Sequence, residues 1–192
     1  MKIGVDIDGV ILNFERELKT YGELYNFLEL KKGGVVNPKK HYLRERYDWT
    51  EEERQNFISK YFVKLTKQTA FMPGAVDVLK MLQADGHKLV IISARGGLVP
   101  EMIDVALEKF ESVGLVFDKC YWAQHNKLET ALAEKLDFII DDYAPTCQVM
   151  AENKIHALYF RDVNMLKIEN NDYLTEVNNW GEIYRIVRTS SK

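Results

Sequence analysis

Asp6 and Asp8 are the residues of this chain whose types and spacing point most directly to chemistry. They come directly after an apolar segment that ends at Val5, and Gly9 follows them. Because side chains alternate along an extended backbone, the two carboxylates are expected to face the same side. Two carboxylates held side by side need a cation or a shared proton. The motif therefore indicates a divalent-metal or acid/base site, and Gly9 permits a tight turn or the close approach of a ligand.

Three other polar segments also end, or closely follow, apolar runs. They contain Ser93, Lys127 and the pair Asp141 and Asp142. Because ligands bind beyond the carboxyl ends of the strands in open parallel sheets, we expect all of these residues to meet the first acidic pair. Up to four negative charges cannot share such a space without a strong cation. Mg²⁺ suits these oxygen ligands, whereas the Cys and His ligands that favour zinc are absent from the four segments.

The elements that must position these residues alternate between strand and helix from about residue 73 to residue 160. Near-continuous apolar runs are typical of parallel strands that are covered on both faces. After the first strand, the strand candidates are 87–93, 117–123, 137–142 and 155–160. Helical spacing of apolar residues falls within 75–82, 102–110 and 128–136, Pro145 suits the start of a helix near 145–153, and the tail at about 171–188 is expected to be a helix. The pattern predicts an α/β fold with a Rossmann-like parallel sheet.

Residues 13–72 interrupt this alternation. A helix is predicted over Phe14–Leu30, followed by a stretch rich in glycine, proline and lysine. A second helix begins at Thr50, with Glu53 completing a capping box, and runs to about Lys67. We therefore expect a Rossmann-like core formed by 1–12 and 73–192, and a small helical cap formed by 13–72.

The order of these motifs resembles the haloacid dehalogenase superfamily of phosphotransferases over residues 1–12 and 73–160. The resemblance implies that Asp6 is the nucleophile and that Asp8 is the general acid and then the base. It implies that Ser93 binds a phosphoryl oxygen and that Lys127 steadies Asp6 and the phosphate. Mg²⁺ would be bound by Asp6, the Asp8 carbonyl and the second acidic pair, either Asp141 alone or Asp142 helping or replacing it. That second pair favours a phosphatase over a dehalogenase.

Within that superfamily the layout is most similar to the 5′(3′)-deoxyribonucleotidase group. The shared features are the Asp-Ile-Asp-Gly-Val opening, a helical cap of about sixty residues, Met72-Pro73-Gly74-Ala75 and Ser93-Ala94-Arg95. The resemblance implies hydrolysis of nucleoside monophosphates, with Ser93, Ala94, Arg95 and Lys127 binding the substrate. The alternatives are a phosphatase of a small sugar or other metabolite phosphate, and a noncatalytic module that binds a phospho-ligand or a protein partner.

Several residues keep two interpretations. Arg95 either contacts a substrate phosphate or ribose, or pairs with a nearby acid at the surface. The aromatic residues of 13–72 either form the core of the cap or stack on a nucleobase. They include Trp49, Phe57, Tyr61 and Phe62. Tyr42 and His41 are no better placed for stacking on a base. The basic stretch from Lys31 to Arg46 is either a solvated linker or a guide for anionic substrates.

Composition limits the class of protein and the compartment that the chain is expected to occupy. The chain has 192 residues, 46% of them hydrophobic and 29% charged, and a formal net charge of −3. This balance is typical of a globular protein and argues against a nucleic-acid polymer as the partner. We find no signal peptide and no apolar run as long as the roughly 18–20 residues that span a membrane. Cys120 and Cys147 lack metal spacing and suggest a reducing compartment, so we expect a cytoplasmic monomer or homodimer.

Overall fold

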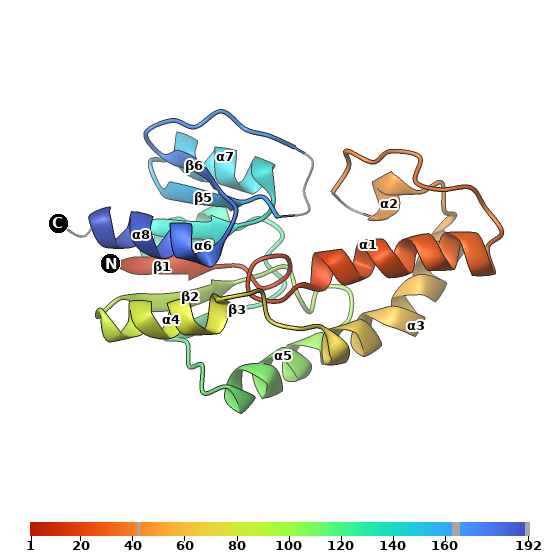
Figure 1. The fold of residues 1–192 in the computed structure, drawn as a ribbon, viewed down its shortest axis with the longest axis horizontal. Coiled ribbons are helices and arrows are strands. Elements are labelled where there is room, and N and C mark those ends of the chain that lie inside the picture. The colour runs from red at the N-terminus through yellow and green to blue at the C-terminus, as the bar shows by residue number, and fades with distance from the viewer. Residues whose placement is uncertain (42, 163–165, 191–192) are drawn as a thin grey trace.

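A single parallel sheet forms the centre of the protein, as the sequence predicts. The computed structural model describes residues 1–41, 43–162 and 166–190, so Tyr42 lies outside the described residues. Within these ranges six strands are hydrogen-bonded in the order β3-β2-β1-β4-β5-β6 (Figure 1). Their bounds are β1 Lys2–Val5, β2 Lys88–Ile92, β3 Lys119–Tyr121, β4 Phe138–Asp141, β5 His156–Phe160 and β6 Leu174–Val177. Each neighbouring pair is parallel, which establishes the α/β Rossmann-like fold.

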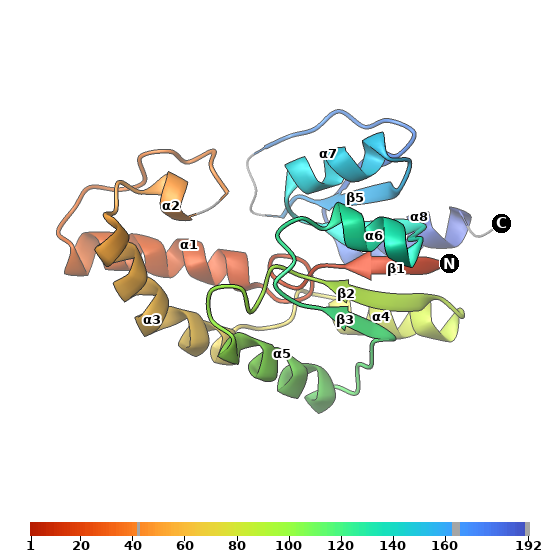
Figure 2. The same cartoon turned by 180° about the vertical axis from the view of Figure 1, so that it is seen from behind.

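Helices cover both faces of this sheet (Figures 1 and 2). Alternate residues of β2 show the division, since Leu89 and Ile91 join one buried cluster and Val90 and Ile92 join another. The first cluster includes apolar residues of α4 (Ala75–Ala84), α5 (Glu101–Ser112) and α8 (Trp180–Ser190). The second includes residues of α6 (Leu128–Glu134) and α7 (Ala144–Glu152). Burial on both faces explains why the strands are almost continuously apolar.

The register of the sheet brings distant residues to one edge. Val5, the last residue of β1, pairs with Ile91 of β2 and Ile140 of β4. The next residue, Asp6, donates its backbone N–H to Ile140 O over 3.0 Å. Asp6 therefore lies at the carboxyl ends of the strands, level with the residues that end β2 and β4.

Residues 13–72 form a helical insertion beyond that edge (Figure 1). Within it lie α1 (Phe14–Leu24), a π-helical turn (Tyr25–Glu29), α2 (Leu43–Arg46) and α3 (Glu51–Gln68). Two backbone hydrogen bonds join its entry and exit, from Asn13 N to Ala70 O over 2.9 Å and from Met72 N to Ile11 O over 2.8 Å. The insertion therefore leaves and re-enters the sheet region through two adjacent chain segments.

The aromatic side chains of the insertion pack mainly against each other. Phe57 is fully buried, and its ring centroid lies 5.3 Å from that of Tyr25 and 4.9 Å from that of Tyr61. Trp49 stacks on Tyr47 with 4.5 Å between ring centroids and 7° between planes. These contacts give the insertion its own small apolar core, which agrees with the packing interpretation.

Several cations of the basic stretch already have protein partners. Lys32 Nζ lies 2.8 Å from Glu53 Oε2, and Lys40 Nζ lies 3.5 Å from Glu45 Oε1. Arg46 Nη1 donates to the carbonyls of Pro38 and Lys40 over 2.8 and 3.0 Å. These side chains hold the 31–46 segment to itself and to α3, which agrees with its interpretation as a linker.

The chain tail differs from the expected helix over 171–188. Residues 174–177 form β6 at the edge of the sheet, and the helix begins only at Trp180. Leu174 and Val177 are buried, and β6 pairs with β5 along its length. Pairing with β5, the strand that precedes it in the chain, outweighed the local helical pattern, which is why the prediction was wrong for this segment.

Two smaller differences concern residues near the predicted site. The helix predicted over Phe14–Leu30 changes at Tyr25 into a π-helical turn. The first strand ends at Val5, so strand alternation does not extend to Asp6 and Asp8. In the part of the chain that the structure describes, no helix combines the length and apolar character that crossing a bilayer requires.

Candidate active site

The loop that follows β1 is closed by bonds to its own backbone. Ile7 O accepts the N–H groups of Ile11 and Leu12, each over 2.9 Å, and Gly9 N donates to Leu12 O over 2.9 Å. Gly9 has φ +77°, and a Cβ at this position would overlap Asp142 Oδ2. The sequence suggested that Gly9 allows a turn or the approach of a ligand; the structure shows a turn and the approach of a carboxylate.

Lys127 links two acidic segments that are far apart in the sequence. Its ammonium lies 2.6 Å from Asp141 Oδ2 and 3.1 Å from Asp6 Oδ1. All three residues are buried, and Asp141 is completely so. The second Asp141 oxygen accepts the N–H of Tyr143 over 2.8 Å, which fixes the carboxylate plane. The register of β1 and β4 and the start of α6 thus bring the predicted groups together.

A group of three carboxylates lies beside this ammonium. Ligand oxygens of Asp6, Asp141 and Asp142 all lie within 4.8 Å of one another. This close set of oxygen donors, with one ammonium among them, has the chemistry that Mg²⁺ prefers. The donor set therefore fits a hard divalent cation and does not fit a metal that requires sulfur or several imidazoles.

The titration behaviour of these groups reflects the crowding. Burial raises the pKa of Asp142 well above its ordinary value, and the nearby Glu15, Asp141 and Asp6 carboxylates raise it further. Burial also raises the pKa of Asp141, although Lys127 opposes the shift. Burial disfavours the charged form of Lys127, but Asp141 and Asp6 outweigh it and raise the pKa of the ammonium. Negative charge therefore exceeds what the lysine compensates.

Asp8 does not take part in the Lys127 contacts and pairs with Arg95 instead. Arg95 Nε donates to Asp8 Oδ2 over 3.2 Å, and Arg95 Nη2 donates to Asp8 Oδ1. The Arg95 side chain is 0% exposed, whereas that of Asp8 is 21% exposed. Burial raises the pKa of Asp8, and Arg95 offsets part of that shift. The arginine thus meets an acid, as one interpretation expected, but in the interior of the protein.

Ser93 and Ala94 occupy different environments after β2. Ser93 is buried, and its Oγ accepts the N–H of Arg95 over 3.2 Å. Ser93 N donates to Tyr121 O over 3.0 Å, which holds the residue at the carboxyl edge of the sheet. Ala94 is exposed, and its carbonyl accepts the N–H of Gly97 over 3.2 Å.

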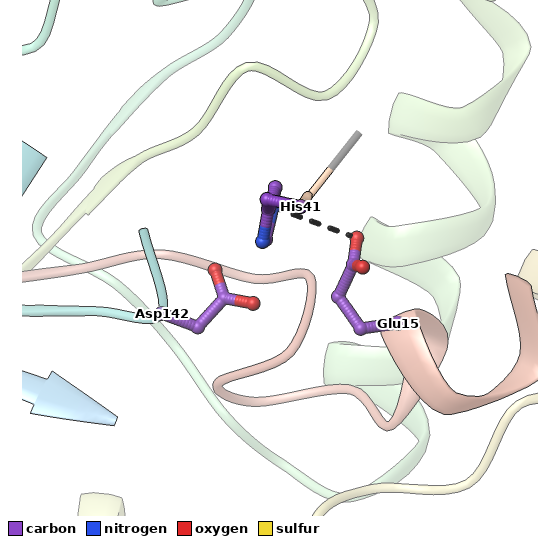
Figure 3. A group of neighbouring side chains, drawn as sticks. All are labelled: Glu15, His41 and Asp142. Atoms are coloured by element: carbon purple, nitrogen blue, oxygen red, sulfur yellow. Dashed lines mark ion pairs between the residues drawn. The ribbon is translucent and has the colours of Figure 1, made fainter. Parts of the chain in front are cut away.

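Glu15 and His41 are further neighbours of this site that sequence reasoning did not select. Figure 3 shows Glu15, from the first turn of α1, and His41 converging with Asp142. Ligand atoms of the three lie within 4.8 Å of one another, and His41 Nε2 is 4.0 Å from Glu15 Oε1. The sequence feature that could have indicated Glu15 as a site residue is its position, seven residues after Asp8 at the start of a helix. The insertion therefore contributes ionisable side chains to the mouth of the site.

Comparisons with known proteins rest on structure. No family model matches the sequence, and no curated protein matches it. A haloacid dehalogenase-like hydrolase from Streptococcus pneumoniae aligns with a TM-score of 0.67 and 16% identity, covering 97% of both chains. A protein from Clostridium acetobutylicum described as a predicted phosphatase aligns with a TM-score of 0.67 and 14% identity over 98% of both. The fold is that of haloacid dehalogenase-like hydrolases.

A third solved structure extends the same likeness. It is described as a predicted phosphoglycolate phosphatase from Haemophilus somnus, with a TM-score of 0.66 and 15% identity over 96% of both chains. The coverage includes the helical insertion as well as the sheet. At these identities the comparisons establish the fold, so roles for individual residues rest on the geometry described above.

Proposed function

We propose that this protein is a Mg²⁺-dependent phosphomonoester hydrolase that works through an aspartyl phosphate on Asp6. The observation that carries the proposal is the contact of Asp6 and Asp141 with one buried ammonium, that of Lys127. Such a site offers a nucleophilic carboxylate, a fixed positive charge for phosphoryl oxygens and donors for a hard cation. The haloacid dehalogenase-like fold, shared with a protein named as a hydrolase and with two described as predicted phosphatases, agrees with this chemistry.

The proposed reaction has two steps. An Asp6 oxygen attacks phosphorus, the bond from phosphorus to the leaving oxygen breaks, and Asp8 gives that oxygen a proton. Water then attacks the aspartyl phosphate and gives a proton to Asp8, and the bond between phosphorus and Asp6 breaks. Lys127 faces phosphoryl oxygens in both steps, and the Ser93 hydroxyl donates a hydrogen bond to one of these oxygens. The net change is ester plus water to alcohol plus phosphate.

Asp6, the backbone carbonyl of Asp8, and Asp141 or Asp142 are the groups proposed to hold Mg²⁺. When bound, the ion would reduce the repulsion between the phosphate and the Asp6 carboxylate. The raised pKa values of Asp141 and Asp142 support the assignment, because they mark buried carboxylates whose charge is incompletely compensated.

The helical insertion is proposed to act as a cap, with 1–12 and 73–192 as the catalytic core. Its entry and exit are adjacent, and Glu15 and His41 place two of its side chains beside Asp142. A unit attached in this way can exclude water from the mouth and contact the leaving group.

The deciding experiment measures phosphate release from 4-nitrophenyl phosphate with and without Mg²⁺. Wild type is expected to turn over only with the metal, and Asp6→Asn is expected to abolish the activity because the amide cannot act as the nucleophile. Asp85→Asn, at an exposed position after α4, is the matched control for a lost carboxylate and should retain turnover. Negligible turnover in wild type and Asp6→Asn alike, with retained binding of inorganic phosphate, would instead support a noncatalytic module.

For the substrate class we propose nucleoside monophosphates, including the deoxy forms, on the strength of the sequence resemblance. Tyr143 supports this proposal, because it directly follows Asp142, is half-buried and lies 5.1 Å from the His41 ring, between centroids. An aromatic face at the mouth is able to stack on a base. The preferred substrate would then be a small phosphorylated molecule rather than a polymer.

A small sugar or metabolite phosphate is the second candidate, and a specific observation favours it. The ring of Phe57 is fully buried and that of Tyr61 nearly so, and both pack against Tyr25, so they are not free to hold a base. Specificity constants for a panel of phosphate esters separate the candidates. Nucleotides should lead by a wide margin under the first proposal, and Tyr143→Ala should raise their KM selectively. A flat profile or a preference for sugar phosphates would overturn it.

A further inference from the structure

Arg95 lies where it can reach both oxygens of Asp8. Its Nε and Nη2 donate to Asp8 Oδ2 and Oδ1 respectively, a two-pronged contact that matches the planar guanidinium to the planar carboxylate. Each carboxylate oxygen has further acceptor capacity, so this contact leaves Asp8 able to exchange a proton. The Asp8 side chain is 21% exposed, whereas the Arg95 side chain that holds it is 0% exposed.

Two other contacts hold the guanidinium in this position, one from α5 and one from α1. Arg95 Nη1 donates to Met102 O of α5 over 3.2 Å. The guanidinium carbon lies 5.3 Å from the ring centroid of Phe14, the first residue of α1. The backbone N–H of Arg95 donates to Ser93 Oγ over 3.2 Å, which fixes the main chain at this residue. Turning the side chain towards a phosphate would break the guanidinium contacts with Asp8 and Met102 and leave buried donors unpaired.

We propose that Arg95 is a positioning residue that orients the Asp8 carboxylate for its proton transfers and does not bind the substrate phosphate. The inference rests on the proposed function, because it assigns Asp8 a reaction in which orientation matters. A displacement of about 1 Å in a reacting group is able to cost roughly 100-fold in rate. Phe14 also makes the insertion part of the support, so the orientation of Asp8 depends on both core and cap.

Two esters of similar shape separate positioning from phosphate binding. The 4-nitrophenolate leaving group of 4-nitrophenyl phosphate needs little protonation, whereas the alkoxide from 4-nitrobenzyl phosphate needs a general acid. The measured quantity is kcat/KM, which reports the step in which the leaving oxygen departs. Arg95→Met is expected to lose about 10- to 100-fold on the benzyl ester and much less on the phenyl ester. A phosphate-binding arginine would lower both values equally, mainly through KM.

A double-mutant cycle with Asp8→Asn supplies the second readout. If Arg95 acts through Asp8, adding Arg95→Met to Asp8→Asn should change kcat/KM little, because the group to be oriented is already lost. Additive losses would overturn the inference. Arg95→Lys keeps the charge and removes the planar fork, so it should show the same selective loss, reduced in size. It serves as the test if Arg95→Met fails to fold, as judged by circular dichroism.

Lys109→Met is the matched control for removal of a nearby, half-buried cation. Lys109 Nζ donates to Thr69 O over 2.8 Å and is not bonded to Asp8. This variant should keep the wild-type ratio of the two kcat/KM values. If the Arg95 variants lose kcat/KM equally on both esters, the positioning role is overturned. The proposed function still stands in that case, provided that wild-type turnover depends on Asp6. Absence of Asp6-dependent turnover in wild type would remove both.

Discussion

At the scale of single residues, the site depends on close approaches that leave no room for a larger neighbour. Asp142 reaches the loop after β1 because Gly9 has no Cβ. Gly9 also has a positive φ, which glycine adopts at little cost and other residues do not. Asp142 in turn lies beside Asp6 and Asp141. A glycine in the first acidic motif therefore controls where a carboxylate of the second motif can lie.

Gly9→Ala tests this dependence against Gly86→Ala. Both glycines have positive φ, +77° and +84°, but a Cβ at Gly86 meets nothing within 4 Å. Gly86→Ala should cost about 1–2 kcal/mol in free energy of unfolding, the usual cost of the left-handed conformation. Gly9→Ala should cost more and should also weaken Mg²⁺ binding, because Asp142 must move. Equal losses of stability in urea titrations, with unchanged Mg²⁺ affinity by calorimetry, would show that Asp142 tolerates the added methyl group.

At the scale of elements, Glu134 joins α6 to the strands β1 and β3, whose first residues are Lys2 and Lys119. Its carboxylate accepts hydrogen bonds from Lys2 Nζ of β1 over 2.9 Å and from Lys119 Nζ of β3 over 2.7 Å, and also from Tyr121. The hydrogen bonds of Lys119, Tyr121 and Lys2 lower the pKa of Glu134 from 4.5 to about 2. These contacts therefore favour the ionised form of the Glu134 carboxyl in the folded protein.

The pH dependence of stability follows from the depressed pKa of Glu134. The unfolded chain takes up a proton at this residue near pH 4.5 and the folded protein only near pH 2. The contribution of Glu134 is therefore fully present above pH 4.5 and is lost as the pH falls towards 2. Glu134→Gln should lower the free energy of unfolding at pH 7, and its difference from wild type should shrink across that window. Glu129→Gln, exposed on the same helix, is the control for lost charge. A constant Glu134→Gln difference from pH 7 to pH 2 would contradict the linkage.

At the scale of the whole molecule, the sheet gathers charge from chain segments that are far apart. Asp6 follows the first strand, and Asp141 and Asp142 stand more than 130 residues later, yet their oxygens form one group. Glu15 and His41 of the insertion converge with Asp142 (Figure 3). A cation bound to this group would stabilise the folded chain, because the unfolded chain has no such site.

Metal binding should therefore raise the melting temperature of the entire protein. At a free Mg²⁺ concentration of about 100 times Kd, linkage predicts about 2.7 kcal/mol, or roughly 5–10 °C for a chain of this size. EDTA should remove the increase. Asp141→Asn and Asp142→Asn should each be compared, since the larger loss of the Mg²⁺-dependent shift identifies the stronger ligand. Glu129→Gln should retain the full shift. An unchanged melting temperature for wild type at millimolar Mg²⁺ would contradict a metal site at these carboxylates.

Local sequence patterns determined most of the elements. The apolar run before Asp141 predicts a buried strand, and β4 occupies it. The capping box of Thr50 and Glu53 predicts the start of α3, and both hydrogen bonds are present. Pro145 lies in the first turn of α7. These features were predictable because periodicity, capping and proline geometry act over a few residues.

Tertiary structure decided which partner each side chain takes within the group that the sequence placed at the carboxyl ends of the strands. The pairing of Asp8 with Arg95, and the contacts of Lys127 with Asp6 and Asp141, depend on rotamers and on the path of the loop after β1. The strand at 174–177 exists because β5 offers it an edge. The sequence by itself determined that carboxylates follow parallel strands, because strand ends are marked locally. Their partners depend on contacts between residues far apart in the chain, which local propensity does not contain.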